Sequence, residues 1–293
     1  MLTQFFGNYL LQKNIINSSQ LMQALQHRNA TRNKLGALAV NAGYMTESEV
    51  EEIHNMQTRY DKRFAEIAVH MGYLTTQQSE ELLNLQKSGY VMLGISLTAL
   101  GIVSDEVMHD AIVSYESEYG LSSANMLDAN DKIVTDMVRK FYGFDNSKPQ
   151  LYGCEYVTLL IKNIIRFVGN DCSLSAPIQS LPEFKVPYSS QQTILGDFTS
   201  NTFICADNET FIAFASRYAG EAFEEDEEFI RESVADFLNL HNGLFTVNIS
   251  NSFSVDLELS PPYTDPIMPK MSPNSRIIPI EFTFGTVYFI FSL

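Results

Sequence analysis

The chain begins with a repeat of 29 residues, and this repeat constrains the N-terminal fold more than any other feature. Four blocks of 24 residues, separated by connectors of five, align without a gap. The third place of each block is Gly or Ala, the tenth is Gly or Asn, and the thirteenth is Thr, Ser or Asn. Helical repeats of this size bury their apolar faces against each other. The blocks begin at Phe5, Lys34, Arg63 and Met92.

Each block is predicted to be a short helix, a tight turn and a second helix. The tenth place reads as a helix stop, because Gly and then Asn best tolerate a left-handed backbone. The thirteenth place reads as an N-cap, and in the first three blocks a Gln or Glu three residues later completes a capping box. Residues 1–120 are therefore predicted to form an all-α domain of four helical repeats. The capping Gln and Glu residues are Gln20, Glu49 and Gln78.

The second block, which contains LGALAVNAGYMTESEVEEIHNMQ, is similar to the repeat of the MshEN domain, the N-terminal module of type II secretion and pilus ATPases. That motif opens with Arg-Leu-Gly, has Gly at the tenth place and ends with Gln at the twenty-fourth. The resemblance implies a cyclic di-GMP site across the two middle blocks. The residues at its motif positions are Lys34, Leu35, Gly36, Gly43, Gln57, Arg63, Gly72 and Gln86.

The repeats depart from this motif at places that matter for a ligand. Lys34 keeps the positive charge of the motif's Arg but lacks the forked guanidinium that binds guanine edges and phosphates. Ala65 places a methyl group where the motif has Gly. The outer two blocks keep the residue types at the third, tenth and thirteenth places, but they lack the motif's first and last residues. Cyclic di-GMP binding and a role as a protein-interaction or spacer module therefore both stay open.

Residues 121–150 are predicted to connect the two domains. The segment DKIVTDMVRKFYGF has apolar residues at helical spacing, and Gly143 is expected to end this helix. The following NSKPQ, residues 146–150, reads as a linker because Pro149 disfavours helical backbone at Lys148.

Residues 151–293 are predicted to form a second domain of helices and strands. Its expected elements are a helix over Tyr156–Val168, irregular structure or edge strand over Cys172–Gln192, a hairpin of Thr193–Phe198 with Thr202–Ala206, a helix from an Asn208 cap to Gly220, and closing strands at Ile277–Phe284 and Thr286–Leu293.

The stretch Glu221–Gly243 is predicted to be an amphipathic helix that carries the chemistry. At about 100° per residue, Glu232, Asp236 and Asn239 share one face. Gly243 is expected to end the helix, and the following GLFTVNIS favours a strand by propensity. The residues on the opposite, apolar face are Ile230, Val234, Phe237, Leu238 and His241.

The spacing from Glu232 through Asp236 and Asn239 to Pro262 resembles the signature of the CheC/CheX family of chemotaxis phosphatases, acid-x3-Glu-x2-Asn-x22-Pro. This chain departs from it at Asp236, where the family has Glu. The resemblance covers about 151–293 and implies an α+β fold, an antiparallel sheet with helices on one face. It also implies that the helix resumes after Gly243, before a strand at Val255–Leu259.

The resemblance further implies a phosphatase of phosphorylated response-regulator receiver domains. Asn239 would hold the attacking water, and the family's Glu, here the shorter Asp236, would pair with the receiver's Lys. Glu232 and Pro262 would form the rim. The chain would need no cofactor of its own, since the receiver supplies the divalent metal. The alternatives are an inactive adaptor that binds a receiver or a pilus or secretion component, and a regulator gated by cyclic di-GMP.

The overall composition narrows the choice of partners and compartment. A net charge of −16 argues against nucleic acid as a partner. The longest apolar run, 282–293, is too short to span a bilayer, so no membrane insertion is expected. No basic region precedes an apolar segment near Met1, and the three cysteines form no paired motif. The chain is therefore expected in the cytoplasm, and no metal site is expected. A homodimer stays open.

Overall fold

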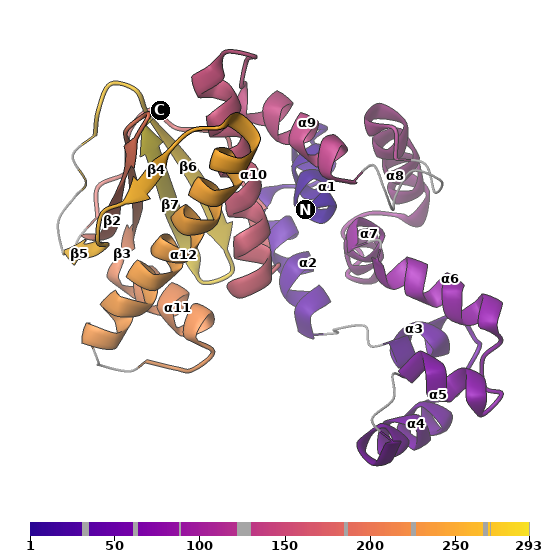
Figure 1. Ribbon diagram of the computed structural model, residues 1–293. Helices are drawn as coiled ribbons and strands as arrows, with labels where there is room; N and C mark the ends of the chain where they lie inside the picture. The colour runs from indigo at the N-terminus through magenta and orange to yellow at the C-terminus, as the bar shows by residue number, and fades with distance from the viewer. Residues whose placement is uncertain are drawn as a thin grey trace. The chain divides into compact units, whose positions relative to one another are not determined.

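Figure 1 shows the computed structural model of the chain, which describes residues 1–293 except 31–34, 61–63, 88, 122–129, 185–186, 224–226, 266–268, 270 and 293. By its internal contacts the chain divides into two compact units. The repeat unit comprises Leu2 and Tyr9–Ser114, and the sheet unit comprises Met1, Thr3–Asn8 and Tyr115–Leu293. This division differs from the expected boundaries at 120 and 151, because the chain from Tyr115 onward, which includes the expected connector, belongs to the sheet unit together with Thr3–Asn8 of the first helix. There, Gln4 Nε2 donates a hydrogen bond to the carbonyl of Asn170 at 2.9 Å.

In the described residues, each of the four blocks contains two helices joined by a turn. The tight turns follow the predicted pattern, since the tenth place has positive φ in every block, from 54° at Asn14 to 75° at Gly72. The helices are α1 (Leu2–Gln12), α2 (Ser18–Ala30), α3 (Leu35–Asn41), α4 (Glu47–Tyr60), α5 (Phe64–His70), α6 (Thr76–Lys87), α7 (Gly89–Ala99) and α8 (Asp105–Tyr119).

Capping boxes start the second helices of the first three blocks, as predicted. The amide of Thr46 donates to Glu49 Oε2 at 2.7 Å, and the amide of Glu49 donates back to Thr46 Oγ1 at 3.3 Å. The same reciprocal pair joins Thr75 with Gln78, and a third joins Asn17 with Gln20. Each box satisfies two backbone N–H groups that have no partner inside the helix.

The third place of the repeat allows the two helices of one block to approach closely. A Cβ on Gly36 would lie 2.4 Å from Val50 Cγ1, and one on Gly94 would lie 3.1 Å from Met108 Cγ. The two middle blocks share one apolar core, which runs from Leu35 on α3 to Leu82 on α6. The outer blocks also meet, because α2 packs against α7. The first block therefore pairs with the fourth, and the second pairs with the third.

The segment predicted to be a linker is the start of a long helix. Helix α9 (Asn130–Tyr142) ends before Gly143, whose φ is 67°, as expected. Helix α10 (Lys148–Phe167) begins directly afterwards, with Ser147 as its N-cap and Pro149 in its first turn. The linker prediction was wrong for 148–150, because a proline in the first turn of a helix lacks only an N–H that would have no helical partner.

The sheet unit contains one antiparallel sheet, in which neighbouring strands are not always consecutive in the sequence (Figure 1). Within the described residues the order is β1-β6-β7-β3-β2-β4, and β5 also pairs with β2. Strand β2 begins well before the predicted Thr193 and lies between β3 and β4, so the prediction of irregular structure or edge strand is wrong for 187–192. The strands are β1 (Cys172–Leu174), β2 (Pro187–Gly196), β3 (Ser200–Asp207), β4 (Leu257–Leu259), β5 (Tyr263–Asp265), β6 (Ser275–Phe282) and β7 (Gly285–Ser292).

Helices α10, α11 (Asn208–Ala219) and α12 (Glu227–Phe253) cover one face of this sheet. On β7, the Phe289 ring lies 6.1 Å from the Phe214 ring of α11, and the Phe291 ring lies 4.8 Å from the Tyr156 ring of α10. On the other face, Tyr288 and Ile290 of β7 pack in a smaller cluster with Ile178, Leu181 and Phe184, which come from the chain between β1 and β2.

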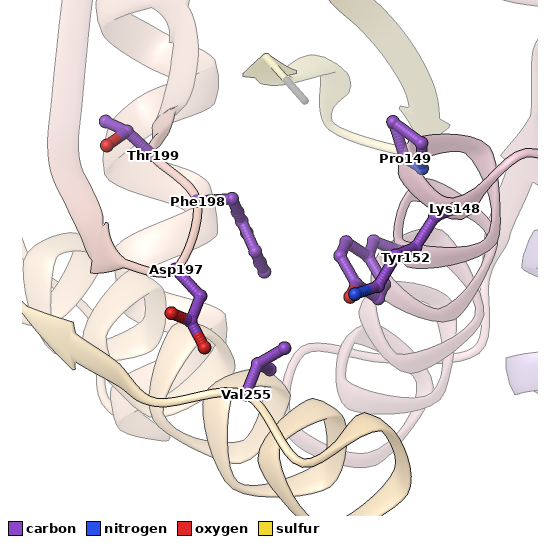
Figure 2. A pocket seen from close by; sticks show the side chains of 7 residues that line it. All are labelled: Lys148, Pro149, Tyr152, Asp197, Phe198, Thr199 and Val255. Carbon is purple, nitrogen blue, oxygen red and sulfur yellow. The ribbon is translucent and has the colours of Figure 1, made fainter.

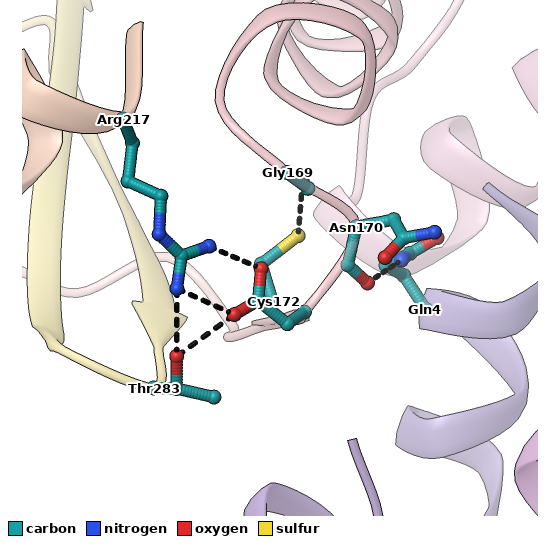
Figure 3. Close-up of polar contacts among 7 residues, drawn as sticks. Gln4, Gly169, Asn170, Cys172, Arg217 and Thr283 are labelled. Atoms are coloured by element: carbon teal, nitrogen blue, oxygen red, sulfur yellow. Dashed lines mark hydrogen bonds and ion pairs between the residues drawn. The ribbon is translucent and has the colours of Figure 1, made fainter. Parts of the chain in front are cut away.

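Helix α11 is fixed at both ends. Its N-cap is Asp207, one residue before the predicted Asn208, and the Asp207 carboxylate accepts from the amide of Thr210 at 2.9 Å. Near its C-terminus, Arg217 donates to both carboxylate oxygens of Asp171, at 2.7 and 3.0 Å. Arg217 also donates to Thr283 Oγ1 at 3.3 Å (Figure 3). Burial would raise the pKa of Asp171, but the hydrogen bonds from Arg217 and Thr283 and the Arg217 charge outweigh it and hold that pKa below its usual range.

Helix α12 runs without interruption through Gly243, so the predicted helix stop was wrong, and the local preference of GLFTVNIS for a strand is not followed. The helix continues because Phe245 and Ile249, one and two turns beyond His241, are buried on the same apolar side. The Phe245 ring lies 5.0 Å from the Tyr156 ring of α10. Tertiary packing outweighs the modest cost of a glycine inside a helix. The continuation implied by the CheC/CheX resemblance is the one observed.

We expect the fold to lose stability as the pH falls below 7, because His241 is buried in a neutral form. It is 1% exposed, and burial lowers its pKa to about 3. The unfolded chain takes up a proton near the usual pKa of about 6.5, so stability decreases as the pH falls through that value. The free energy of unfolding from urea titrations should be about 2 kcal/mol lower at pH 5 than at pH 7.

The control for this prediction is His241→Gln, which cannot take up a proton in the unfolded state. This variant should be less stable than the wild type at pH 7 but should lose most of the change between pH 7 and pH 5. An unchanged pH dependence in the folded variant would show that another group causes it.

Candidate functional site

Helix α12 places the predicted site residues on its exposed face. Glu232, Asp236 and Asn239 are all exposed, whereas Val234 and Phe237 between them are buried. The helix is held in this rotation by aromatic packing. The Phe237 ring lies 5.1 Å from Phe214 and 5.4 Å from Tyr218, both on α11.

These three residues and Pro262 line one open groove of about 630 Å³. Pro262 comes from the connection between β4 and β5, so residues far apart in the sequence meet here. Phe229, 57% exposed, forms an apolar part of the wall. The remaining lining residues are Tyr218, Ala219, Ser233 and Ala235.

One oxygen of the Asp236 carboxylate already accepts a hydrogen bond within the chain. The Tyr218 hydroxyl donates to Asp236 Oδ2 at 2.6 Å. Burial, together with this hydrogen bond and the adjacent negative charge, raises the pKa of Tyr218 well above its usual value, so the hydroxyl keeps its proton. No hydrogen bond to the second carboxylate oxygen, Oδ1, comes from the described part of the chain. Tyr218 was not predicted as a site residue, since its only signal in the sequence is a place on the apolar stripe of α11.

The Asn239 amide accepts a hydrogen bond from a buried residue of the sheet. Gln192 Nε2, on β2, donates to Asn239 Oδ1 at 2.7 Å and to the carbonyl of Ser260 at 2.8 Å. Gln192 is 2% exposed. It was missed because the segment Cys172–Gln192 was interpreted as irregular structure or edge strand, and a buried glutamine has no spacing motif that would reveal it.

The groove is acidic. Glu232 and Asp236 both line it, and no Lys or Arg is among the described residues that line it. A free phosphate ester would meet two negative charges and no cation there, which opposes binding. A ligand for this groove must therefore bring its own positive charge.

Figure 2 shows a second, smaller cavity of about 230 Å³, at the turn between β2 and β3 and the start of α10. The Phe198 ring stacks on Tyr152 at 4.9 Å. The cavity contains one amine, from Lys148, and one carboxylate, from Asp197, and none of the predicted site residues.

The predicted cyclic di-GMP residues fall into two groups. Lys34 and Arg63 lie outside the described residues, as do the side chains of Gln57 and Gln86. The others have structural roles. Leu35 is buried, Gly36 contacts Val50, and Gly43 and Gly72 form the turns with φ of 69° and 75°.

In the described part of the chain, no three His, Cys, Asp or Glu side chains are grouped so that they could hold a metal ion. None of its helices combines the length and the apolar character needed to cross a membrane.

No family model and no curated protein matches the chain. Among solved structures, it is similar to the chemotaxis protein CheX of Desulfovibrio desulfuricans, with 13% identity and a TM-score of 0.42 over 48% of this chain and 98% of that one. CheX of Vibrio vulnificus gives 14% and 0.42, over 48% and 97%. The CheX–CheY–BeF3–Mg complex of Borrelia burgdorferi gives 17% and 0.41, over 48% and 95%. These CheX-like neighbours cover the C-terminal half of the chain.

We expect the contact between Tyr218 and Asp236 to stabilise the packing of α11 on α12. A double-mutant cycle of Tyr218→Phe and Asp236→Ala, measured by urea denaturation, should give a coupling energy of about 0.5–1 kcal/mol at low salt, in the range for hydrogen bonds near the surface. Additive effects of the two substitutions would show that the hydrogen bond contributes nothing measurable.

Proposed function

We propose that the sheet unit is a phosphatase of phosphorylated receiver domains and acts through the groove on α12. The observation that carries this proposal is the convergence of Glu232, Asp236, Asn239 and Pro262 on one open groove. The spacing of these residues in the sequence did not require them to meet, because Pro262 lies beyond the end of the helix.

The charge of the groove supports a receiver as the substrate. A phospho-aspartate in a receiver is accompanied by that protein's own divalent metal ion and Lys, so the phosphoryl group arrives with its charge compensated. An acidic groove then attracts the cationic surroundings of the phosphoryl group, and it would disfavour an isolated phosphate ester. The exposed Phe229 gives this surface an apolar contact suited to a protein partner.

The proposed hydrolysis requires the groove mainly to position the reacting groups. The oxygen of a water molecule attacks phosphorus, the bond from phosphorus to the aspartate oxygen breaks, and the aspartate leaves as a carboxylate. The proton of the water passes to the phosphate product. Asn239 holds this water in line through its amide, and Asp236 pairs with the receiver's Lys through its second carboxylate oxygen. Fixing an attacking water can account for a large part of such a rate enhancement.

One observation favours a second candidate, an adaptor that binds a receiver without hydrolysis. Asp236 is one methylene shorter than the Glu of the CheC/CheX signature, and Tyr218 holds one of its oxygens at 2.6 Å. Because of its shorter side chain and this hydrogen bond, the Asp236 carboxylate reaches less far into a docked partner. The two candidates differ in whether phosphate is lost from a bound receiver.

We expect Asn239→Ala to abolish dephosphorylation and to leave receiver binding nearly unchanged, because the side chain is exposed and acts on the water. The measurement is the decay of receivers labelled by a small phosphodonor, with and without the chain. The matched control is Asn248→Ala, an exposed asparagine on the same helix that lies outside the groove. Equal activity of Asn239→Ala and wild type would remove Asn239 from the mechanism.

Asp236→Glu should keep or raise the rate, because the longer side chain extends the reach of the carboxylate toward the receiver's Lys. The same decay assay measures it, and calorimetric titration gives the affinity for the receiver. A rate that rises from undetectable to measurable would identify the wild-type chain as the adaptor. A large loss of rate would show that the contact depends on the short acid held by Tyr218.

A further inference from the structure

A chain of buried hydrogen bonds beneath Asn239 determines which end of its amide faces the groove. It consists of Gln192 on β2, Thr202 on β3, Asn242 on α12 and Tyr156 on α10, each at most 3% exposed. Amide oxygen and nitrogen are nearly the same size, so only hydrogen-bond partners can fix their orientation. The orientation here can be followed from two backbone carbonyls, which can only accept.

The first carbonyl fixes Asn242. The Thr202 hydroxyl donates its single proton to the carbonyl of Gln192 at 2.8 Å. Toward Asn242, this hydroxyl can therefore only accept, so the atom facing it at 2.8 Å must be Nδ2. The other end of the Asn242 amide is consistent with this assignment, because the Tyr156 hydroxyl donates to Asn242 Oδ1 at 3.2 Å.

The second carbonyl fixes Gln192. Only a donor can face the carbonyl of Ser260 at 2.8 Å, so that atom of Gln192 is Nε2. Its oxygen then faces Asn242 Nδ2, also at 2.8 Å, and accepts from it. The remaining proton of Nε2 reaches Asn239 at 2.7 Å, and the atom of Asn239 that receives it must be Oδ1. The Asn239 NH₂ group consequently faces away from Gln192.

We infer that Gln192 is a positioning residue for the reaction proposed above, and this inference rests on that proposed function. Gln192 holds Asn239 so that the groove receives a donor and not a carbonyl oxygen. A donor binds one lone pair of the attacking water and leaves the other directed at phosphorus. It also attracts the negative oxygens of the phosphoryl group, which a carbonyl oxygen would repel. Asn242 and Thr202 act one step further back, by holding Gln192.

The test compares Gln192→Met with Gln191→Met. Gln191 is the preceding residue of β2, and it is exposed whereas Gln192 is buried. Gln192→Met should lower the rate constant for dephosphorylation of a saturating receiver by about 10- to 100-fold, as expected for a misplaced catalytic group. Its affinity for a receiver carrying beryllofluoride should stay within about twofold of wild type, since the contact surface is unchanged. Gln191→Met should match the wild type in both measurements.

Circular dichroism first establishes that Gln192→Met is folded. A folded variant with the wild-type rate would overturn the inference, as would an equal loss of rate and affinity, which indicates general damage to the groove. If Gln192→Met does not fold, Thr202→Val tests the same chain of hydrogen bonds with almost no change in volume. A folded Thr202→Val protein should lose rate several-fold and keep its affinity, and an unchanged rate would count against the inference.

The orientation itself is tested in the full chain without any activity measurement. In NMR spectra with labelled side-chain amides, the Gln192 NH₂ protons should exchange slowly with solvent and the Asn239 NH₂ protons rapidly. Slow exchange at Asn239 would overturn the inference even if the phosphatase is real. If instead this pattern holds but the wild-type chain accelerates phosphate loss from none of the receivers tried, the proposed function fails and the placement of Asn239 by Gln192 stands.

Discussion

The groove depends on one packing contact, the burial of Phe237 between α11 and the sheet. Its ring meets Phe214 and Tyr218 on α11 at 5.1 and 5.4 Å and Phe289 on β7 at 6.4 Å. This contact sets the rotation of α12 about its axis. Because Asp236 precedes Phe237 directly, the same rotation places its carboxylate at the Tyr218 hydroxyl. A rotation of one residue, about 100°, would bury the acid and separate it from this partner.

Local features of the sequence were enough to predict much of this arrangement. The exposed face of α12 follows from helical periodicity, and the capping boxes and left-handed turns follow from the residue types at fixed places of the repeats. Both are interactions within a few residues, for which spacing is a direct measure of distance. The meeting of Asn239 with Pro262 was implied only by a resemblance to a known signature.

The features that were missed depend on contacts between distant parts of the chain. Gln192 is 47 positions from Asn239 in the sequence, and only the pairing of β2 with β3 turns it toward α12. The same holds for the helix through Gly243, where burial of Phe245 overrides a local preference. At Pro149 the error was of another kind, since proline disfavours helix after its first turn but suits the first turn itself.

The nested pairing of the repeats has a consequence for how they fold. The second and third blocks are adjacent in sequence, whereas α2 and α7 of the outer blocks are separated by the whole of that middle pair. Closing a long loop costs more entropy than closing a short one. Once the middle blocks have docked on their shared core, they bring Ala30 and Gly89 closer together and shorten the effective loop between the outer helices. The repeats are then expected to assemble from the inside outward, with the first and last blocks joining late, which is an order that the linear arrangement of four equal blocks would not suggest.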